Sequence, residues 1–470
     1  METEKSKAEL LKEKLTLKSK NAYEACDSAE IDAAYAYSAD YMKFLNTAKT
    51  EREAVATAVS MLEENGFVPF EYGKKYVPGD KVYFNNRGKA LYILVIGKKS
   101  LDEGLSIAAA HVDSPRIDLK QNPLYEDDGM AFFKTHYYGG IKKYQWVTTP
   151  LALHGVIAKE NGEIVDVCIG EDESDPIFYI TDLLPHLGKD QAAKTLGNAI
   201  GGEQLNILAG SRPYDDEKIS EKVKLNILAL LNEKYDVTEA DLLSAELCLV
   251  PSAKARDVGF DRSLIGAYGH DDRVCAYPIL TAAIECAKQV PTYTHVTILA
   301  DKEEIGSEGN TGMRSFAFEN MLVELAVNAG ANPRVMFANS KCLSADVNAC
   351  YDPNFAEVYE SRNSAHINKG VAVTKFTGSR GKSGTNDAHA EYVALVRRLL
   401  NEKNVLWQTA ELGKVDQGGG GTVAMYIAKL NIDTIDVGVP VLSMHAPYEV
   451  VSKTDVYMAY KAFLAFFERT

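Results

Sequence analysis

The chain has 470 residues, which predicts two or three globular units and ample material for a large core. Hydrophobic residues make up 46% and charged residues 25%, as in ordinary globular proteins, and no apolar run approaches the roughly 18 residues needed to cross a bilayer. The formal net charge of −15 repels nucleic acid and anionic lipid, and no basic run offsets it. The composition therefore predicts neither a nucleic-acid partner nor a membrane partner.

Two features of the sequence predict a cytoplasmic location. The first 29 residues are densely charged with both signs and lack the apolar stretch of a secretory signal. The seven cysteines are an odd number, and no two of them have the two-residue spacing of zinc ribbons or redox motifs. We therefore expect buried, reduced thiols in a reducing compartment.

The hydrophobic pattern predicts an α/β fold. Apolar residues at helical spacing indicate one long helix over residues 38–66, which Gly66 would end. Further along, short apolar runs of the kind that form buried strands alternate with helical segments. The expected strands are residues 90–97, 105–110, 296–300 and 435–442, and the later helices are 387–400 and a final one that opens with the capping pattern Ser452–Asp455. This alternation predicts a mostly parallel sheet sandwiched by helices.

Residues 119–249 differ in composition from the rest of the chain. They are rich in aromatic and β-branched residues, with short turn signals such as Asn161–Gly162 and only one or two helical segments. We therefore expect residues 119–249 to form a β-rich domain, inserted into an α/β domain that is made of residues 1–118 and 250–470.

Four apolar runs are each followed by side chains of the kinds that bind metals. These side chains are His111 after residues 106–110, Glu303 and Glu304 after 298–300, Asp346 after 341–343, and His445 after 437–444. Functional groups of an open parallel sheet gather beyond the carboxyl ends of its strands. We therefore expect these side chains to converge on one cleft.

The residue types in this set suit a two-metal hydrolase. Imidazoles and carboxylates bind zinc, cobalt or manganese, and a shared carboxylate lets two such ions lie about 3.5–4 Å apart. Asp271 is a fifth candidate ligand. One member of the pair Glu303–Glu304 can bind a metal while the other accepts a proton from water, and Asp113 can orient the imidazole of His111.

Each of these motifs also has a structural alternative. A single His after a strand is more often a structural histidine, and a pair such as Glu303–Glu304 is usually a solvated charge. The run Ser344–Ala345–Asp346 alone is typical of a helix cap. The joint pattern favours a metal site, because core strands normally exclude polar residues at such positions.

Five motifs in order along the chain are His-Val-Asp-Ser-Pro from His111, Asp-Asp-Arg from Asp271, Asp-Lys-Glu-Glu-Ile-Gly-Ser from Asp301, Ser-Ala-Asp from Ser344 and Leu-Ser-Met-His from Leu442. In this order and spacing they closely resemble the aspartyl aminopeptidase family of co-catalytic zinc aminopeptidases. The resemblance implies a zinc-peptidase α/β domain with an inserted β-rich dimerisation domain. It also implies that dimers assemble into a hollow tetrahedral dodecamer.

The resemblance implies a metal centre with two divalent ions per subunit, zinc in the first place with cobalt or manganese as alternatives. The matched ligands are His111, Asp271, Glu304, Asp346 and His445. Among them Asp271 would be the bridging carboxylate, and Glu303 would be the general base.

Three further positions concern the substrate. By resemblance, His186 matches a His that reaches into the active site of the neighbouring subunit, although the residues around it favour a buried, hydrogen-bonded imidazole. Residues 375–385 depart from the Arg-Tyr-Ala-Thr-like run of acid-specific members. We expect Lys375 or Arg380 to contribute positive charge to substrate selectivity, and the alternative is an enzyme with neutral or broad preference. The structural alternative for both residues is that they are solvated loop charges without a specific role.

The predicted function is a metalloaminopeptidase that removes the first residue of peptides. A two-metal site does not by itself choose an end of the peptide, so a deacetylase or a carboxypeptidase is an alternative. The alternative from another class is a metal-free scaffold or cargo protein.

Overall fold

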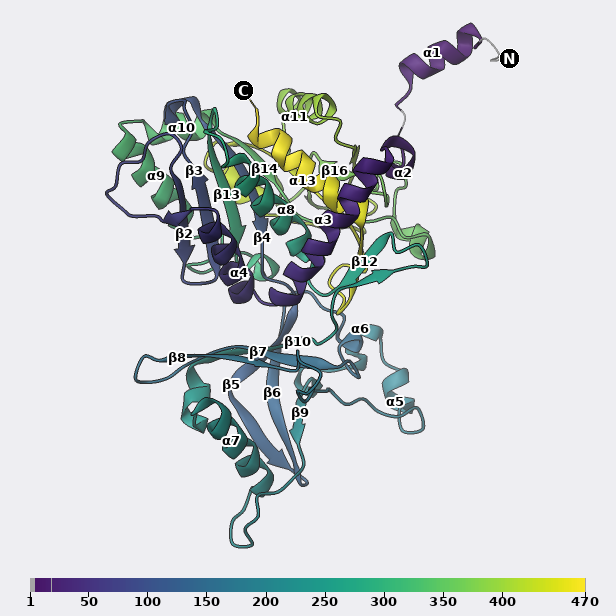
Figure 1. The fold of residues 1–470 in the computed structure, drawn as a ribbon. Helices are drawn as coiled ribbons and strands as arrows, with labels where there is room; N and C mark the ends of the chain where they lie inside the picture. Colours follow the sequence, from purple (N-terminus) through teal and green to yellow (C-terminus); the bar gives the residue numbers. More distant parts are fainter. Residues whose placement is uncertain (1–4, 18, 470) are drawn as a thin grey trace.

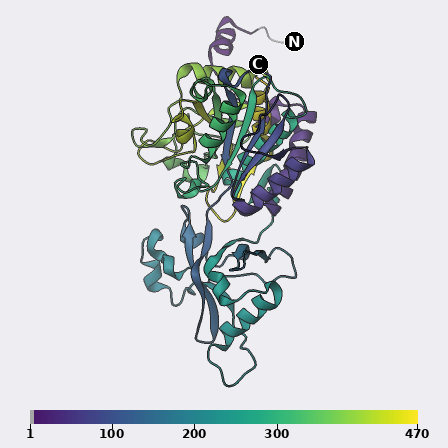
Figure 2. The same cartoon turned by 90° about the vertical axis from the view of Figure 1, so that its left-hand side faces the viewer.

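The computed structural model describes residues 5–17 and 19–469, which form two units stacked one above the other (Figures 1 and 2). The larger unit contains a nine-stranded sheet. Its strands, in spatial order, are β1 (Val68–Pro69), β2 (Lys81–Asn86), β3 (Ala90–Val95), β13 (Thr294–Ala300), β4 (Leu105–His111), β14 (Lys341–Ser344), β20 (Asp433–Gly438), β16 (Val371–Thr374) and β18 (Trp407–Thr409).

The direction of the strands makes this a large mixed sheet. Five of its eight neighbouring pairs are parallel and three are antiparallel. The four central strands, β13, β4, β14 and β20, are all parallel to one another. The predicted α/β fold is therefore confirmed, and the carboxyl ends of its central strands share one edge.

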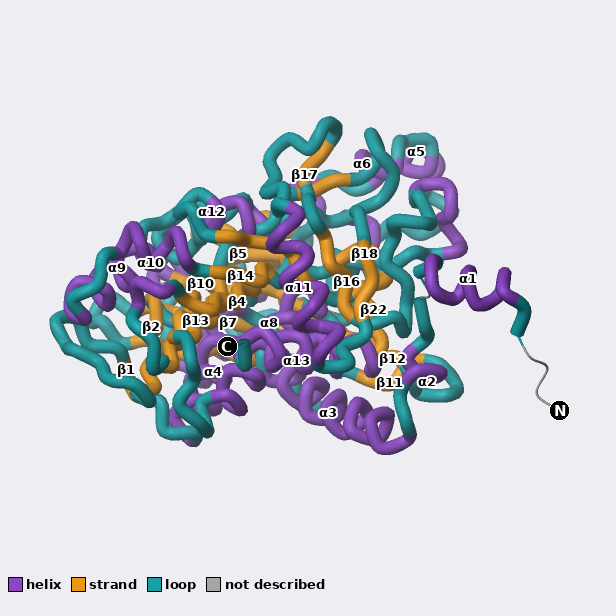
Figure 3. The backbone as a smooth tube through the Cα atoms, turned by 90° about the horizontal axis from the view of Figure 1, so that it is seen from above, coloured by secondary structure: helices purple, strands orange, loops and turns teal. Residues whose placement is uncertain are grey.

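Helices cover both faces of this sheet, and Figure 3 shows the strands between them. One face packs against α3 (Ser28–Thr47), α4 (Glu51–Glu64), α8 (His270–Cys286), α11 (Ala390–Glu402) and α13 (Lys453–Phe467). The other face packs against α9 (Ala317–Ala329), α10 (Pro333–Asn339) and α12 (Ala424–Ala428). Strand β3 illustrates the division, because Leu91 and Ile93 lie in the first core while Tyr92 and Leu94 lie in the second.

Two expected elements are divided in the structure. The predicted helix over 38–66 is wrong as one element, because Ala48 leaves helical geometry and a capping box at Thr50 starts a new helix. The hydroxyl of Thr50 accepts a hydrogen bond from the Glu53 backbone N–H at 3.2 Å. The predicted strand 435–442 is also divided, into β20 and β21 (Pro440–Leu442), which belong to different sheets.

The smaller unit is built on a six-stranded antiparallel sheet with a core of its own. Its strands, in spatial order, are β8 (Ile164–Ile169), β7 (Leu151–Ala158), β10 (Ala245–Pro251), β5 (Arg116–Asp127), β6 (Met130–Tyr138) and β9 (Ile207–Gly210). Helix α7 (Lys222–Tyr235) packs on this sheet. The chain enters the sheet at Arg116 and leaves it at Pro251.

Several smaller elements complete the described chain. A five-stranded sheet has the order β11 (Arg256–Val258), β12 (Leu264–Ala267), β22 (Glu449–Ser452), β21 and β15 (Asn348–Ala349), and a two-stranded sheet joins β17 (Gly378–Ser379) to β19 (Gly419–Gly420). The remaining helices are α1 (Lys7–Leu15), α2 (Ala22–Ala25), α5 (Lys189–Ala192) and α6 (Leu196–Ala199). The 3-10 turns are Leu101–Glu103, Lys143–Gln145, Gly202–Gln204, Glu239–Ser244, Glu303–Ile305 and Pro353–Val358. Within the described ranges, no helix has the length and apolarity that a bilayer crossing requires.

Candidate metal centre

The side chains that follow the central strands converge at the shared carboxyl edge of the large sheet. His111 is the last residue of β4, the turn Glu303–Ile305 follows β13, and Asp346 follows β14. Asp271 lies at the start of α8, and His445 lies in the loop between β21 and β22. All five predicted metal-binding residues thus meet in one place, as the distances below show.

Asp271 lies between two imidazoles. Its Oδ1 lies 3.1 Å from Nε2 of His111, and its Oδ2 lies 3.1 Å from Nε2 of His445. Burial alone would raise the pKa of Asp271, but its contacts with His111 and His445 outweigh burial and lower that pKa. The carboxylate is therefore ionised, with one oxygen directed to each side.

A further carboxylate accompanies each imidazole. Oε2 of Glu304 lies 3.5 Å from Nε2 of His445, and Oδ1 of Asp346 lies 3.9 Å from Nε2 of His111. Two three-residue groups here have ligand atoms within 4.8 Å of one another, namely His111, Asp271 and Glu304, and His111, Asp272 and Asp346. The sequence analysis did not assign Asp272 to the site.

The donor set fits divalent metal ions. Oδ1 of Asp271 and Oε1 of Glu304 are buried without a hydrogen-bond partner among the described residues. Burial and the nearby acidic side chains raise the pKa values of Glu304 and Asp346 well above the ordinary range. Cations would satisfy the unpaired oxygens and offset the repulsion between these carboxylates.

Asp113 contacts several of the residues that form the centre. Its Oδ1 accepts a hydrogen bond from the Glu303 backbone N–H, and its Oδ2 accepts one from the Glu304 N–H, both at 3.1 Å. Its Oδ1 also lies 3.2 Å from Nδ1 of His111. Asp113 thus contacts both the imidazole that it was predicted to orient and the turn that carries the two glutamates.

Glu449 is a positioning residue that the sequence analysis missed. It is the first residue of β22 and is buried. Its Oε1 accepts a hydrogen bond from the His445 backbone N–H at 2.9 Å, and its Oε2 accepts one from the Asp271 N–H at 3.2 Å. In the sequence, Glu449 is marked only by its position directly before the apolar pair Val450–Val451. It belongs to none of the motifs, so the sequence analysis did not select it.

The centre opens into a cavity of about 500 Å³. Glu303 faces this cavity, and burial raises its pKa to about 7. The apolar part of the lining comes from Val347, Leu412, Met425, Tyr426 and Met444, and residues 419–421 add three glycines. Among the described residues that line the cavity there is no Lys or Arg.

The other predicted substrate residues, Lys375, Arg380 and His186, are not among the described residues that line this cavity. Nζ of Lys375 lies 3.0 Å from Oδ1 of Asp387, and Lys382 contacts the same carboxylate at 2.9 Å. Arg380 lies in the exposed loop after β17. His186 is exposed on the smaller unit, in a segment where Leu184 and Leu187 are also exposed, rather than buried as the residues around it suggest.

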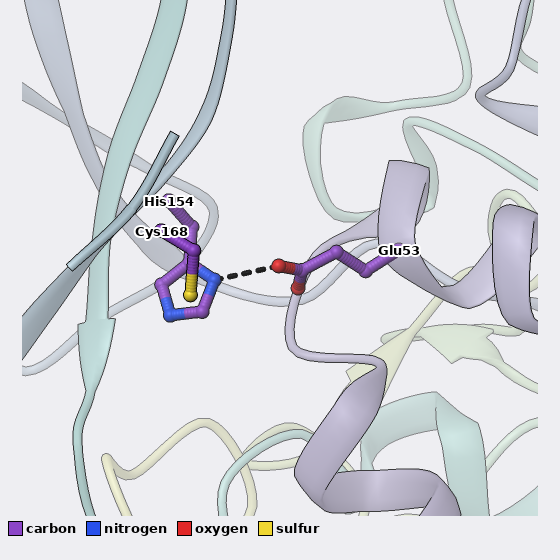
Figure 4. A group of neighbouring side chains, drawn as sticks. All are labelled: Glu53, His154 and Cys168. Carbon is purple, nitrogen blue, oxygen red and sulfur yellow. Dashed lines mark hydrogen bonds and ion pairs between the residues drawn. The ribbon is translucent and has the colours of Figure 1, made fainter. Parts of the chain in front are cut away.

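A second group of metal-binding side chain types joins the two units (Figure 4). Glu53 lies on α4, and His154 and Cys168 face each other on β7 and β8. Both ring nitrogens of His154 contact carboxylates, Nδ1 with Glu53 at 2.7 Å and Nε2 with Glu171 at 3.1 Å.

Lysines already balance the charge of this second group. Lys49 contacts Glu171 at 2.6 Å, and Lys254 contacts it as well. Burial opposes protonation of His154, but its contacts with Cys168, Glu171 and Glu53 outweigh burial and raise its pKa to about 11. Three cations therefore face the two carboxylates, which disfavours a metal ion and makes this group an ion-pair link between the units.

The fold and the first group together define a metallohydrolase of the α/β class. Residues 44–467 match the family described as aminopeptidase I zinc metalloprotease (M18), so the chain belongs to the M18 family. Its members are zinc metalloproteases, and the predicted aminopeptidase function is confirmed.

Individual relatives agree with this assignment. A probable M18 family aminopeptidase 1 of Clostridium acetobutylicum is 50% identical over 455 residues, which cover 95% of this chain and 97% of the relative. The crystal structure of an M18 aminopeptidase from Thermotoga maritima has a TM-score of 0.92 and 43% identity, covering 97% of this chain and all of that one. A dodecamer of S. cerevisiae mApe1, with a TM-score of 0.75, 23% identity and coverage of 94% of this chain and 98% of that one, shares the fold.

Proposed function

We propose that the centre binds two zinc ions per subunit, with cobalt or manganese as alternatives. One ion would be held by Asp271, Glu304 and His445, and the other by His111, Asp271 and Asp346. The observation that carries this proposal is the orientation of Asp271, whose two oxygens each lie 3.1 Å from a different imidazole. A carboxylate in this arrangement suits a bridging ligand.

Zinc at such a site lowers the pKa of water and polarises a carbonyl group. Glu303 is the general base: it accepts a proton from the attacking water and then gives it to the leaving amine. Its position fits this role, because it adjoins the ligand Glu304 and faces the cavity. Asp113 accepts hydrogen bonds from the backbone of Glu303 and Glu304. Glu449 does the same for the backbone of Asp271 and His445.

For the substrate, we propose peptides with a neutral, apolar first residue. The cavity next to Glu303 is lined in part by Met425, Met444 and Leu412, and its described lining includes no Lys or Arg. An acidic side chain would be buried there without a counter-ion, which is costly. Lys375 does not offset this cost, because it contacts Asp387 instead.

We also propose a homo-oligomer built from dimers, as large as a dodecamer, in which His186 completes the site of a neighbouring subunit. His186 is too exposed for a structural histidine, and leucines 183, 184 and 187 around it are exposed as well. Such a surface favours contact with another subunit. An imidazole there would donate a hydrogen bond to the substrate carbonyl as negative charge develops.

For the location we propose the cytoplasm, in keeping with the free cysteines of the described chain. The function as a whole is tested with one peptide prepared with a free and with an acetylated amino terminus. An aminopeptidase releases the first residue only from the free form. Cleavage of the acetyl group would indicate a deacetylase, and release of the last residue would indicate a carboxypeptidase.

A further inference from the structure

The end of strand β6 reaches from the smaller unit to the metal centre. The hydroxyl of Tyr138, the last residue of β6, donates a hydrogen bond to Oδ2 of Asp113 at 2.8 Å. Two residues later, the carbonyl of Gly140 accepts a hydrogen bond from Nδ1 of His445 at 2.7 Å. Because a carbonyl oxygen only accepts, this bond makes Nδ1 of His445 the donor, and it directs Nε2 at Asp271. One short segment of the smaller unit therefore contacts both sides of the centre.

Asp113 is the point through which Tyr138 acts. Its carboxylate is fully buried and accepts hydrogen bonds from the N–H groups of Glu303 and Glu304. An ionised carboxylate has acceptors only, so the hydroxyl of Tyr138 must be the donor. Without that hydroxyl, Oδ2 of Asp113 would keep a single donor, the Glu304 N–H, and the carboxylate could rotate away from His111.

The ring of Tyr138 is held independently of its hydroxyl. It lies 4.1 Å from the guanidinium of Arg116, measured to the ring centroid. Arg116 is fixed in turn by Glu51 at 2.9 Å and by Asp118 at 2.7 Å. Removing the hydroxyl alone therefore leaves the packing of the ring in place.

We propose that Tyr138 is a positioning residue for the peptidase reaction, which sets the orientation of His111 and of the Glu303–Glu304 turn through Asp113. The smaller unit thereby contributes to the geometry of the catalytic centre of its own chain. This inference rests on the proposed metal ligands and on Glu303 as the base.

The test compares Tyr138→Phe with the control Tyr137→Phe. Tyr137 is the preceding residue of β6, and its side chain is 40% exposed. The readouts are kcat and KM on one peptide, the rate at which a chelator removes zinc, and the melting temperature. Loss of a residue that orients a metal ligand typically costs roughly 10–100-fold in activity or metal affinity.

For Tyr138→Phe we expect a kcat at least about tenfold lower, an unchanged KM and zinc removal at least about tenfold faster, within the range for such residues. Tyr137→Phe should match the wild type in all of these. Wild-type kcat and zinc removal in Tyr138→Phe, even with a lower melting temperature, would overturn the proposal. A wild-type protein without peptidase activity or zinc would instead overturn the proposed function.

A double-mutant cycle with Asp113→Asn tests the route through Asp113. If Tyr138 acts through that carboxylate, Tyr138→Phe adds less than about twofold to the faster zinc removal of Asp113→Asn. If the increase in the rate of zinc removal in the double variant equals the product of the increases in the two single variants, Tyr138 does not act through Asp113. Because chelation needs no turnover, this readout holds even where Asp113→Asn is inactive.

Discussion

Oδ2 of Asp271 and Nε2 of His445 lie 3.1 Å apart, although the two residues are 174 positions apart in the chain. The other oxygen of the same carboxylate faces His111 at the same distance. In the proposed metal centre, Asp271 is therefore common to two sets of ligands, each with one imidazole and one further carboxylate. Its replacement should therefore affect both metal ions, whereas the replacement of any other proposed ligand should affect one.

Asp271→Ala should remove both metal ions, because both ligand sets depend on this carboxylate. Asp346→Ala, which affects one set only, should keep about one ion per subunit. Elemental analysis after dialysis against metal-free buffer measures the difference. Equal metal content in the two variants would contradict a bridging role for Asp271.

The cavity predicts faster hydrolysis of amino-terminal Leu than of amino-terminal Asp, by about tenfold or more, because the acidic side chain would lack a counter-ion. Lys375→Ala and Arg380→Ala should leave this ratio unchanged. Met425→Lys, which places a cation in the lining, should shift the ratio toward Asp. The measurement is kcat/KM on a panel of fluorogenic substrates, and a preference for Asp that Lys375→Ala abolishes would refute the apolar pocket.

The raised pKa of His154 predicts that the protein becomes less stable to unfolding as the pH rises into the alkaline range. Its pKa of about 11 in the folded protein exceeds the value of about 6.5 for a free imidazole. The folded state thus holds an extra proton between these values, so the stabilisation is complete below pH 6.5 and decreases as the pH rises toward 11. The urea midpoint should fall between pH 6.5 and 9.5 in the wild type, and much less in His154→Gln. Parallel slopes for the two proteins would contradict the ion-pair link.

If His186 acts in a neighbouring subunit, two inactive variants should complement each other. Subunits with Glu303→Gln and subunits with His186→Ala are dissociated, mixed and reassembled. Mixed dimers then contain one site with an intact Glu303 and a neighbour's intact His186, and these should recover activity. His186→Ala alone should lower turnover by roughly 10²–10³-fold without loss of zinc. Verified mixed dimers that stay inactive would exclude the role in trans.

The sequence predicted the parts of the fold that depend on continuous apolar runs. The runs 90–97, 105–110 and 296–300 became β3, β4 and β13 because central strands are buried on both faces. The break at Ala48 was missed, because the Thr50 capping box interrupts a pattern that remains apolar at helical spacing. Element types were thus easier to predict than their ends.

The candidate site divides in a similar way. The convergence of the five candidate metal ligands was predictable, because each follows an apolar run or belongs to a motif. Glu449 and Tyr138 were not, because they act through backbone groups and a buried carboxylate supplied by distant parts of the chain. Such contacts exist only once the sheets are packed together.

The central claim is that Glu303 moves the proton while its neighbours bind the metals. Glu303→Gln keeps the size of the side chain and removes its basicity, so it tests this division directly. We expect two zinc ions per subunit by elemental analysis, as in the wild type, together with a kcat lower by about 10²–10⁴-fold, the usual contribution of a general base. Near-normal kcat in the zinc-loaded variant would contradict the account.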